Sequence, residues 1–216
     1  MGLRTKEPAL EKIVLLGAGK IGGAIVELLC SSGSYKLKVA DRERSLLDTI
    51  KRDDIERDRL DVEDAASLRR LMEGSDAVIS ALPYYLNSAV AEAARDCGLH
   101  YFDLTEDVAT TRKVRKIAES ASTAFVPQCG LAPGFVSVVA MDLAKRFDRL
   151  ESVRMRVGAL PQYPTNSLTY NLTWSTDGLI NEYCNPCEAI HDGRRMEVLP
   201  LQGIEHFSLD GVTYEA

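Results

Sequence analysis

The chain has 216 residues, a formal net charge of −6 and a pI of about 5.2. Its 45% hydrophobic and 27% charged residues are typical of a globular protein, and no basic stripe indicates a nucleic-acid partner. No apolar run approaches the roughly 20 residues that span a bilayer, and residues 1–11 are charged without an apolar signal core, so we expect no membrane partner and a cytoplasmic protein.

The most informative segment lies near the N-terminus, where an apolar run over 12–16 leads into Gly17–Gly22 with the pattern G-x-G-x-x-G. A strand before this pattern and a helix after it predict a dinucleotide-binding loop. The first glycine would allow a tight turn, the second would let the backbone approach a pyrophosphate, and the third would let the helix pack closely on the strand. The residues expected to contact the dinucleotide here are Gly17, Gly19, Lys20, Ile21 and Gly22.

A second strand is expected over 35–40 and ends at Asp41, 19 residues after Gly22. This spacing is close to that of the acid that accepts hydrogen bonds from the adenosine ribose. A carboxylate there favours NAD because it repels a 2′-phosphate. Arg42 follows directly and could instead pair with that phosphate, so NADP is the alternative. Asp41 could also be a helix or turn cap before Ser45.

Strands then alternate with helical patterns as far as 147, which predicts βαβ units and a parallel sheet. The expected strands cover 55–62, 76–82, 100–104 and 124–126, and the expected helices cover 65–72, 87–97, 109–121 and 136–147. Asn87 should cap the second of these helices. Asp61 and Val62 are expected at the adenine ring, and the segment Ala81, Leu82 and Pro83 beneath the nicotinamide ribose.

After residue 148 the pattern becomes β-rich. Strands are expected over 152–160 and 169–174, a short helix over 177–183, and hairpins at Asp192-Gly193 and Asp210-Gly211. The predicted fold is therefore a Rossmann-type doubly wound α/β domain at 1–135, followed at 136–216 by part of an α+β domain.

The five cysteines are scattered and odd in number, which indicates reduced thiols. Cys184 and Cys187 form a C-x-x-C that could be a redox pair or half of a zinc site. No second C-x-x-C or nearby histidine pair completes four ligands, so we expect no metal.

Five segments of the chain belong to one recognisable set: Gly17–Gly22, Ala81–Tyr85, Tyr101–Thr105, Gly130–Gly134 and Leu172–Ser175. Together they resemble the saccharopine dehydrogenase and lysine 6-dehydrogenase family, and the resemblance extends over nearly the whole chain. The resemblance is greatest to the lysine 6-dehydrogenase branch. It implies an α+β domain that binds an amino-acid substrate and mediates homodimerisation. It also implies hydride transfer between a nicotinamide cofactor and a carbon that bears nitrogen, with a lysine- or saccharopine-like substrate.

Amine oxidation needs a group that accepts the ammonium proton. Glu106 is the first candidate and Asp103 the second, although the first could be a helix-terminus carboxylate and the second a buried hydrogen-bonding residue. Tyr84 could form a wall or donate a hydrogen bond. Trp174 is expected beside the substrate or nicotinamide on the basis of the resemblance, with a core or interface position as the alternative. Pro133 and Gly134 precede a helix whose N-terminus could face a substrate carboxylate.

Enzymes of this family are considerably longer, so relative to the family the chain is expected to be truncated at its C-terminus. The resemblance therefore favours cofactor binding more strongly than turnover. The alternative to an oxidoreductase is a dinucleotide-binding module without catalysis, or an inactive truncated paralogue. A potassium-transport regulatory domain would share only the first glycine segment.

Overall fold

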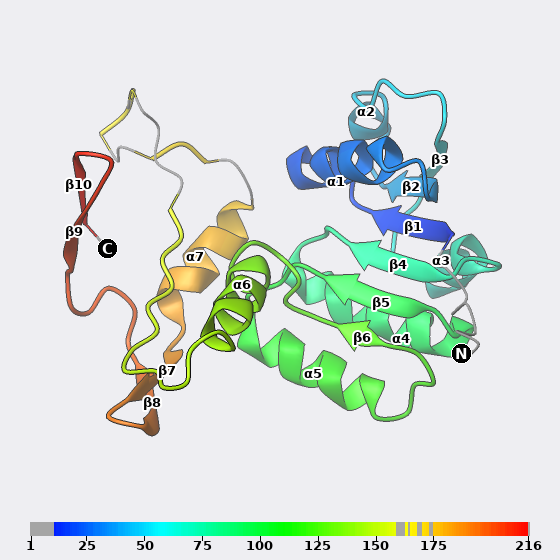
Figure 1. The fold of residues 1–216 in the computed structure, drawn as a ribbon. Helices are drawn as coiled ribbons and strands as arrows, with labels where there is room; N and C mark the ends of the chain where they lie inside the picture. Colours follow the sequence, from blue (N-terminus) through cyan, green and yellow to red (C-terminus); the bar gives the residue numbers. More distant parts are fainter. Residues whose placement is uncertain (1–10, 159–162, 164, 168–169, 173–174, 216) are drawn as a thin grey trace, which may run out of the picture. The chain divides into compact units, whose positions relative to one another are not determined.

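The computed structural model describes residues 11–158, 163, 165–167, 170–172 and 175–215. Its internal contacts divide the chain into two compact units, Met1–Phe135 and Val136–Ala216 (Figure 1). Each unit is described by itself below.

The first unit is built on a six-stranded parallel sheet with the strand order β3-β2-β1-β4-β5-β6. The strands are β1 (Lys12–Leu16), β2 (Lys36–Asp41), β3 (Glu56–Arg59), β4 (Ala77–Ser80), β5 (His100–Asp103) and β6 (Phe125–Val126). The chain winds outward from β1 to β3 and then crosses back to place β4 on the other side of β1. This order confirms the doubly wound fold, and the order reverses between β1 and β4.

Helices cover both faces of this sheet (Figure 1). They are α1 (Lys20–Ser31), α2 (Arg44–Leu47), α3 (Ala65–Met72), α4 (Asn87–Cys97) and α5 (Val108–Ala118). Successive residues of β1 point to opposite faces, and helices cover both, which explains why the strand is apolar and buried from Ile13 to Leu16. Ile13 and Leu15 belong to the cluster that includes Val26 of α1 and Leu47 of α2.

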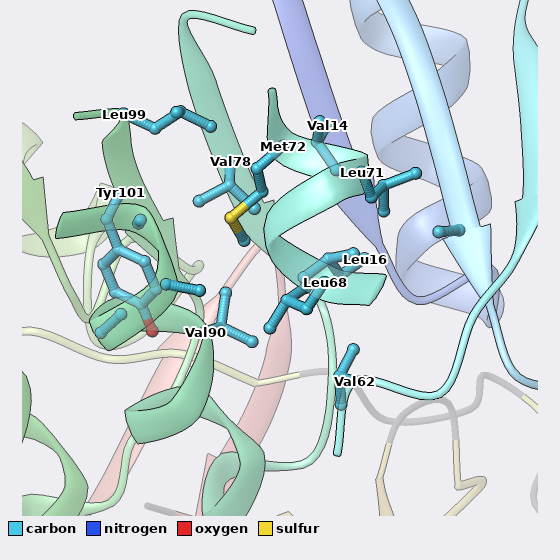
Figure 2. Packing of buried hydrophobic residues seen from close by; sticks show 14 of the residues in the cluster. Val14, Leu16, Val62, Leu68, Leu71, Met72, Val78, Val90, Leu99 and Tyr101 are labelled. Atoms are coloured by element: carbon cyan, nitrogen blue, oxygen red, sulfur yellow. The ribbon is translucent and has the colours of Figure 1, made fainter. Parts of the chain in front are cut away.

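The other cluster is larger and joins β1 and β4 to the helices α3, α4 and α5. Figure 2 shows Leu68, Leu71 and Met72 of α3 gathered over Val14 and Leu16 of β1. The helical spacing of the three α3 residues gives that helix one apolar face, which the sheet buries. The two clusters pack against opposite faces of the sheet, and the carboxyl edge of the strands carries the candidate site.

Two sequence expectations in this unit need correction. The third strand is shorter than 55–62, because only Glu56–Arg59 pair with β2 at the edge of the sheet. Asn87 does not cap α4 with its side chain: a short 3₁₀ turn, Tyr84–Leu86, precedes it, and Leu86 is the N-cap. The buried Asn87 Oδ1 instead accepts a hydrogen bond from Ser80 Oγ at 2.6 Å.

In the second unit, the described residues include α6 (Phe135–Ala144, which begins at the last residue of the first unit), α7 (Thr176–Cys184) and two hairpins. The hairpins pair β7 (Cys187–His191) with β8 (Arg194–Val198) and β9 (His206–Leu209) with β10 (Val212–Glu215). Both turn pairs, Asp192-Gly193 and Asp210-Gly211, have positive φ at both residues, as the expected hairpin turns require.

The strand expected over 152–160 is wrong for 152–158, which are exposed and have no paired strand among the described residues. An alternating pattern specifies a strand only where a neighbour supplies hydrogen bonds and one face is buried. Of the strand expected over 169–174, residues 170–172 have no strand pairing and the others lie outside the described residues. No helix in the described ranges is both long and apolar enough to cross a bilayer.

The packing of α1 against the loop before it yields a first prediction. A Cβ on Gly22 would lie 1.9 Å from the carbonyl oxygen of Gly17, which is backbone and cannot move aside, whereas a Cβ on Gly23 would meet nothing within 4 Å. Gly22→Ala should lower the free energy of unfolding by about 1–3 kcal/mol. Gly23→Ala is the matched control in the same helix and should leave it equal or raise it by about 0.5–1 kcal/mol. Urea unfolding followed by circular dichroism measures both, and equal midpoints for the two variants would contradict the close packing.

Candidate functional site

The glycine loop after β1 has the geometry that a dinucleotide requires. Gly17 has φ +100°, and its N–H donates to the carbonyl of Ala40 at 2.8 Å. A Cβ on Gly17 would lie 2.7 Å from the carbonyl oxygen of Ala81, so a side chain is excluded there. Gly19, directly before α1, has open space around it, with no atom within 4 Å of a Cβ position. Lys20 and Ile21 form the first turn of α1. The free space and the helix N-terminus together fit a pyrophosphate.

The loop after β4 lies against this glycine loop. The N–H of Ala81 donates to the carbonyl of Leu16 at 2.8 Å, and a side-chain methyl of Leu82 lies 3.4 Å from the Cβ position of Gly17. Pro83 is the residue directly before the 3₁₀ turn Tyr84–Leu86. The segment 81–83 therefore leaves the sheet where the strand order reverses, which is where open α/β sheets bind their ligands.

Asp41 at the end of β2 is buried, and backbone groups use both of its carboxylate oxygens. Oδ2 accepts from the N–H of Ala18 at 2.8 Å, and Oδ1 accepts from the N–H of Glu43 at 2.8 Å. The first of these bonds fixes the glycine loop to β2, and the second shapes the turn before α2. The carboxylate thus has a structural role beside its predicted contact with ribose, which stays a prediction.

A shallow depression of about 470 Å³ lies beyond the carboxyl ends of β2 and β3, where a Rossmann fold places adenosine. It is lined by Arg42, Glu43, Arg59 and Asp61. The expected Asp61 is exposed there, whereas Val62 is 8% exposed and packs in the larger core cluster. Arg59 and Glu43 line the depression but were not predicted from the sequence. The sequence shows only that charged residues lie near the ends of these strands, and it is the pairing of β2 with β3 that brings them together.

Asp103 at the end of β5 is the centre of a buried polar cluster. Its Oδ2 accepts from the hydroxyl of Tyr101 at 2.7 Å, and its Oδ1 accepts from the N–H groups of Thr105 and Gln128, each at 3.0 Å. Burial raises the pKa of the Asp103 carboxyl above its ordinary value of 3.8, although these three hydrogen bonds favour the ionised form. Asp103 is fully buried and joins the loop after β5 to the loop after β6, so the geometry gives it a positioning role.

Glu106 lies in a loop whose conformation is set by its neighbours. The N–H of Asp107 donates to Thr105 Oγ1 at 3.1 Å, and Asp107 Oδ1 caps α5 by accepting from the N–H of Thr110 at 2.6 Å. Glu106 itself is half-buried between them. Because Ser80 pairs in register with Asp103, the loops after β4 and β5 leave the sheet side by side.

Of the other catalytic candidates, Tyr84 opens the 3₁₀ turn and packs edge-on against Tyr85, with the ring centroids 5.8 Å apart. Trp174 lies outside the described residues. Cys184 and Cys187 are exposed free thiols. The described part of the chain contains no group of three or more metal-ligating side chains.

The segment Gly130–Gly134 closes on itself. The N–H of Gly130 donates to the carbonyl of Pro133 at 3.0 Å, and the N–H of Phe135 donates to the carbonyl of Gly130 at 2.8 Å. A Cβ on Gly134 would lie 2.2 Å from the Gly130 carbonyl oxygen, so only glycine fits this return. α6 begins directly after it, as expected for Pro133 and Gly134.

The glycine loop, the order of the strands and the open N-terminus of α1 define a dinucleotide-binding protein of the Rossmann class. Residues 13–126 match the model of the saccharopine dehydrogenase NADP binding domain, and residues 130–214 match that of the saccharopine dehydrogenase C-terminal domain. The chain belongs to the saccharopine dehydrogenase family.

Named relatives agree with this assignment. The chain is 26% identical over 196 residues to the mitochondrial alpha-aminoadipic semialdehyde synthase of Rattus norvegicus, a match that covers 87% of the chain and 21% of that protein. It is 24% identical over 197 residues to saccharopine dehydrogenase [NADP(+), L-glutamate-forming] of Schizosaccharomyces pombe, which covers 88% of the chain and 44% of that enzyme. The chain thus spans less than half the length of these relatives.

A solved structure confirms the fold. Apo saccharopine dehydrogenase (L-Glu forming) from Saccharomyces cerevisiae superposes with a TM-score of 0.69 at 20% identity, and the match covers 95% of this chain and 48% of that one.

The raised pKa of Asp103 yields a prediction about pH. The unfolded chain loses the Asp103 proton at a lower pH than the folded protein does, so the folded state binds more protons between the two pKa values. Stability from this group is complete below about pH 4 and is lost as the pH rises through the folded pKa. Asp103→Asn removes this titration, so its free energy of unfolding relative to the unsubstituted protein should increase across that window and then level off.

Denaturant unfolding at a series of pH values measures this difference. Tyr101→Phe removes a hydrogen bond that favours the ionised carboxylate, so it should widen the window. If the free energies of unfolding of Asp103→Asn and of the unsubstituted protein differ by the same amount at every pH, the pKa of Asp103 is not raised.

The open backbone at Gly19 yields a prediction about binding. Aspartate is a favourable residue before a helix, and the site has room for it, so Gly19→Asp should fold with undiminished stability. Its carboxylate would face the pyrophosphate and should weaken dinucleotide binding by roughly 100-fold or more. Ala24→Asp adds the same charge on an exposed position of α1 and should bind normally. Fluorescence titration with NADH and NADPH distinguishes them, and unchanged affinity in Gly19→Asp would remove the loop from the site.

Proposed function

We propose that the chain acts as an oxidoreductase on an amino acid, with hydride transfer between a nicotinamide dinucleotide and a carbon that bears an amine or imine nitrogen. A lysine- or saccharopine-like molecule is the proposed substrate. The observation that carries the proposal is the junction of the loops after β1 and β4, where Gly17 lies against Ala81 and Gly19 is open to a ligand. The names of the relatives support the substrate class.

The residues of the first unit divide the work of holding the cofactor. The open backbone before α1 would receive the pyrophosphate, and the segment 81–83 would lie along the nicotinamide ribose. The depression beyond β2 and β3 would receive the adenosine end. When bound there, the nicotinamide supplies the hydride acceptor for amine oxidation and the hydride donor for the reverse reaction.

Glu106 is the proposed general base. The substrate ammonium must first lose a proton, because the freed nitrogen lone pair forms the C=N bond as the hydride passes to the nicotinamide; a base near the nitrogen must accept that proton, and a carboxylate can do so. Glu106 is half-buried in a loop held by Thr105 and Asp107, which would limit its movement during the reaction. Asp103 is the weaker candidate because it is fully buried and its oxygens already bind three donors. Tyr84 and Trp174 are proposed to line the substrate.

The second unit is proposed to bind the amino-acid substrate and to mediate homodimerisation. The match of residues 130–214 to the saccharopine dehydrogenase C-terminal domain supports the first proposal. Light scattering of the whole chain would test dimerisation.

A dinucleotide-binding module without turnover is the second candidate. The match of residues 13–126 to the saccharopine dehydrogenase NADP binding domain supports this candidate, because dinucleotide binding needs only that part of the family's machinery. Binding of NADPH or NADH without oxidation of lysine or saccharopine would support this second candidate.

Substitution of Glu106 tests the catalytic proposal. Glu106→Gln keeps the size of the side chain and removes its basicity, so turnover should fall by about 10²–10⁴-fold while cofactor affinity stays unchanged. Glu119→Gln makes the same change at the exposed C-terminal end of α5 and should leave turnover unaltered. The absorbance of reduced nicotinamide, followed with lysine and with saccharopine, measures the rate. Equal rates for the Glu106 and Glu119 variants would exclude Glu106 as the base.

A further inference from the structure

Two arginines from neighbouring strand ends line the depression at the adenosine end. Arg42 directly follows β2, and Arg59 is the last residue of β3, where it pairs in register with Asp41. Arg59 Nε donates to the carbonyl of Arg42 at 3.0 Å. This bond holds the Arg59 guanidinium beside the backbone that follows the C-terminal end of β2.

The two arginines differ in their ion pairs. The Arg42 side chain is 73% exposed and approaches Glu43 at 3.6 Å, a long and solvated contact. Arg59 has no ion pair among the described residues. Asp61 Oδ1 accepts from the N–H of Glu63 at 3.1 Å, so this carboxylate is partly held by its own turn. The depression therefore presents one guanidinium in a long, solvated ion pair and one that has no ion pair among the described residues and uses only Nε for a carbonyl.

Asp41 is the acid that would be expected to discriminate against a 2′-phosphate, but its position limits that role. It is 9% exposed, and its two oxygens accept from the N–H groups of Ala18 and Glu43. Its negative charge is thus offset by two backbone dipoles and lies beneath the surface on which a phosphate would rest.

From this arrangement we infer that Arg59 is a specificity-determining residue, which together with Arg42 binds the 2′-phosphate of NADP. The inference rests on the proposed dinucleotide binding and names the determinant of cofactor choice within that site. Two guanidinium groups can each offer paired N–H donors to a phosphate, which is the geometry that arginine fits best. On binding, Arg42 exchanges its exposed contact with Glu43 for the phosphate, while Arg59 keeps its bond to the Arg42 carbonyl and uses its remaining donors.

Substitution of Arg59 tests the inference. Arg59→Met keeps the apolar stem and removes the guanidinium, so the Kd for NADPH should rise by about 10-fold or more, while the Kd for NADH changes by less than about 3-fold. Adenosine 2′,5′-bisphosphate and 5′-AMP are a second pair of probes that lack the nicotinamide half, and they should show the same contrast. Arg44→Met is the matched control, since Arg44 pairs with Asp48 in α2 and lies outside the depression.

The outcomes separate the two claims. Tighter binding of NADPH than NADH, lost in Arg59→Met and kept in Arg44→Met, supports the inference. If the whole chain binds NADH at least as tightly as NADPH, or if Arg59→Met weakens both equally, the inference is overturned and dinucleotide binding stands. If neither nucleotide binds, the proposed function fails and the inference with it.

Discussion

The cofactor end of this protein depends on a crowded contact between three pieces of backbone around Gly17. The residue lies against the carbonyl of Ala81 on one side, and its own carbonyl lies against Gly22 on the other. Because Gly17 and Gly22 have no side chains, β1, α1 and the loop after β4 can approach one another more closely than any other residue would allow. The backbone at Gly19 in the same loop is uncovered, and an uncovered helix start allows a negative ligand to bind.

Two buried carboxylates then fix the loops at the same edge of the sheet. Asp41 ties the glycine loop to β2, and Asp103 ties the loop after β5 to the loop after β6. Both act by accepting hydrogen bonds from backbone N–H groups that would otherwise be unpaired in a loop. The loop at the proposed cofactor site and the loops at the proposed substrate site are thus each held by a buried carboxylate on a different strand. Loss of the hydrogen bonds of one carboxylate does not remove those of the other.

The sequence predicted those features that follow from local pattern. Glycine spacing predicted the loop at Gly17–Gly22, and the Asp-Gly pairs predicted both hairpin turns. Features that depend on contacts with residues distant in the sequence could not be predicted. The alternation over 152–160 could not reveal that 152–158 lack a paired strand, and the spacing of Asp41 gave its position without showing that backbone amides bind both oxygens. The convergence of Arg42 with Arg59 follows only from the register of β2 and β3.

The double use of Asp41 restricts how this protein can evolve. A mutation to a residue without an acceptor releases the N–H groups of Ala18 and Glu43 together, and Asn can accept from only one of them, so loss of the charge at that position also loosens the glycine loop or the turn before α2. The side chains of Arg42 and Glu43 are exposed and hold no buried backbone, so they can vary at little cost to folding. Selection for a change of cofactor between NAD and NADP would therefore act on the exposed side chains that line the depression. Asp41 would be retained because the fold needs it, whichever cofactor is bound.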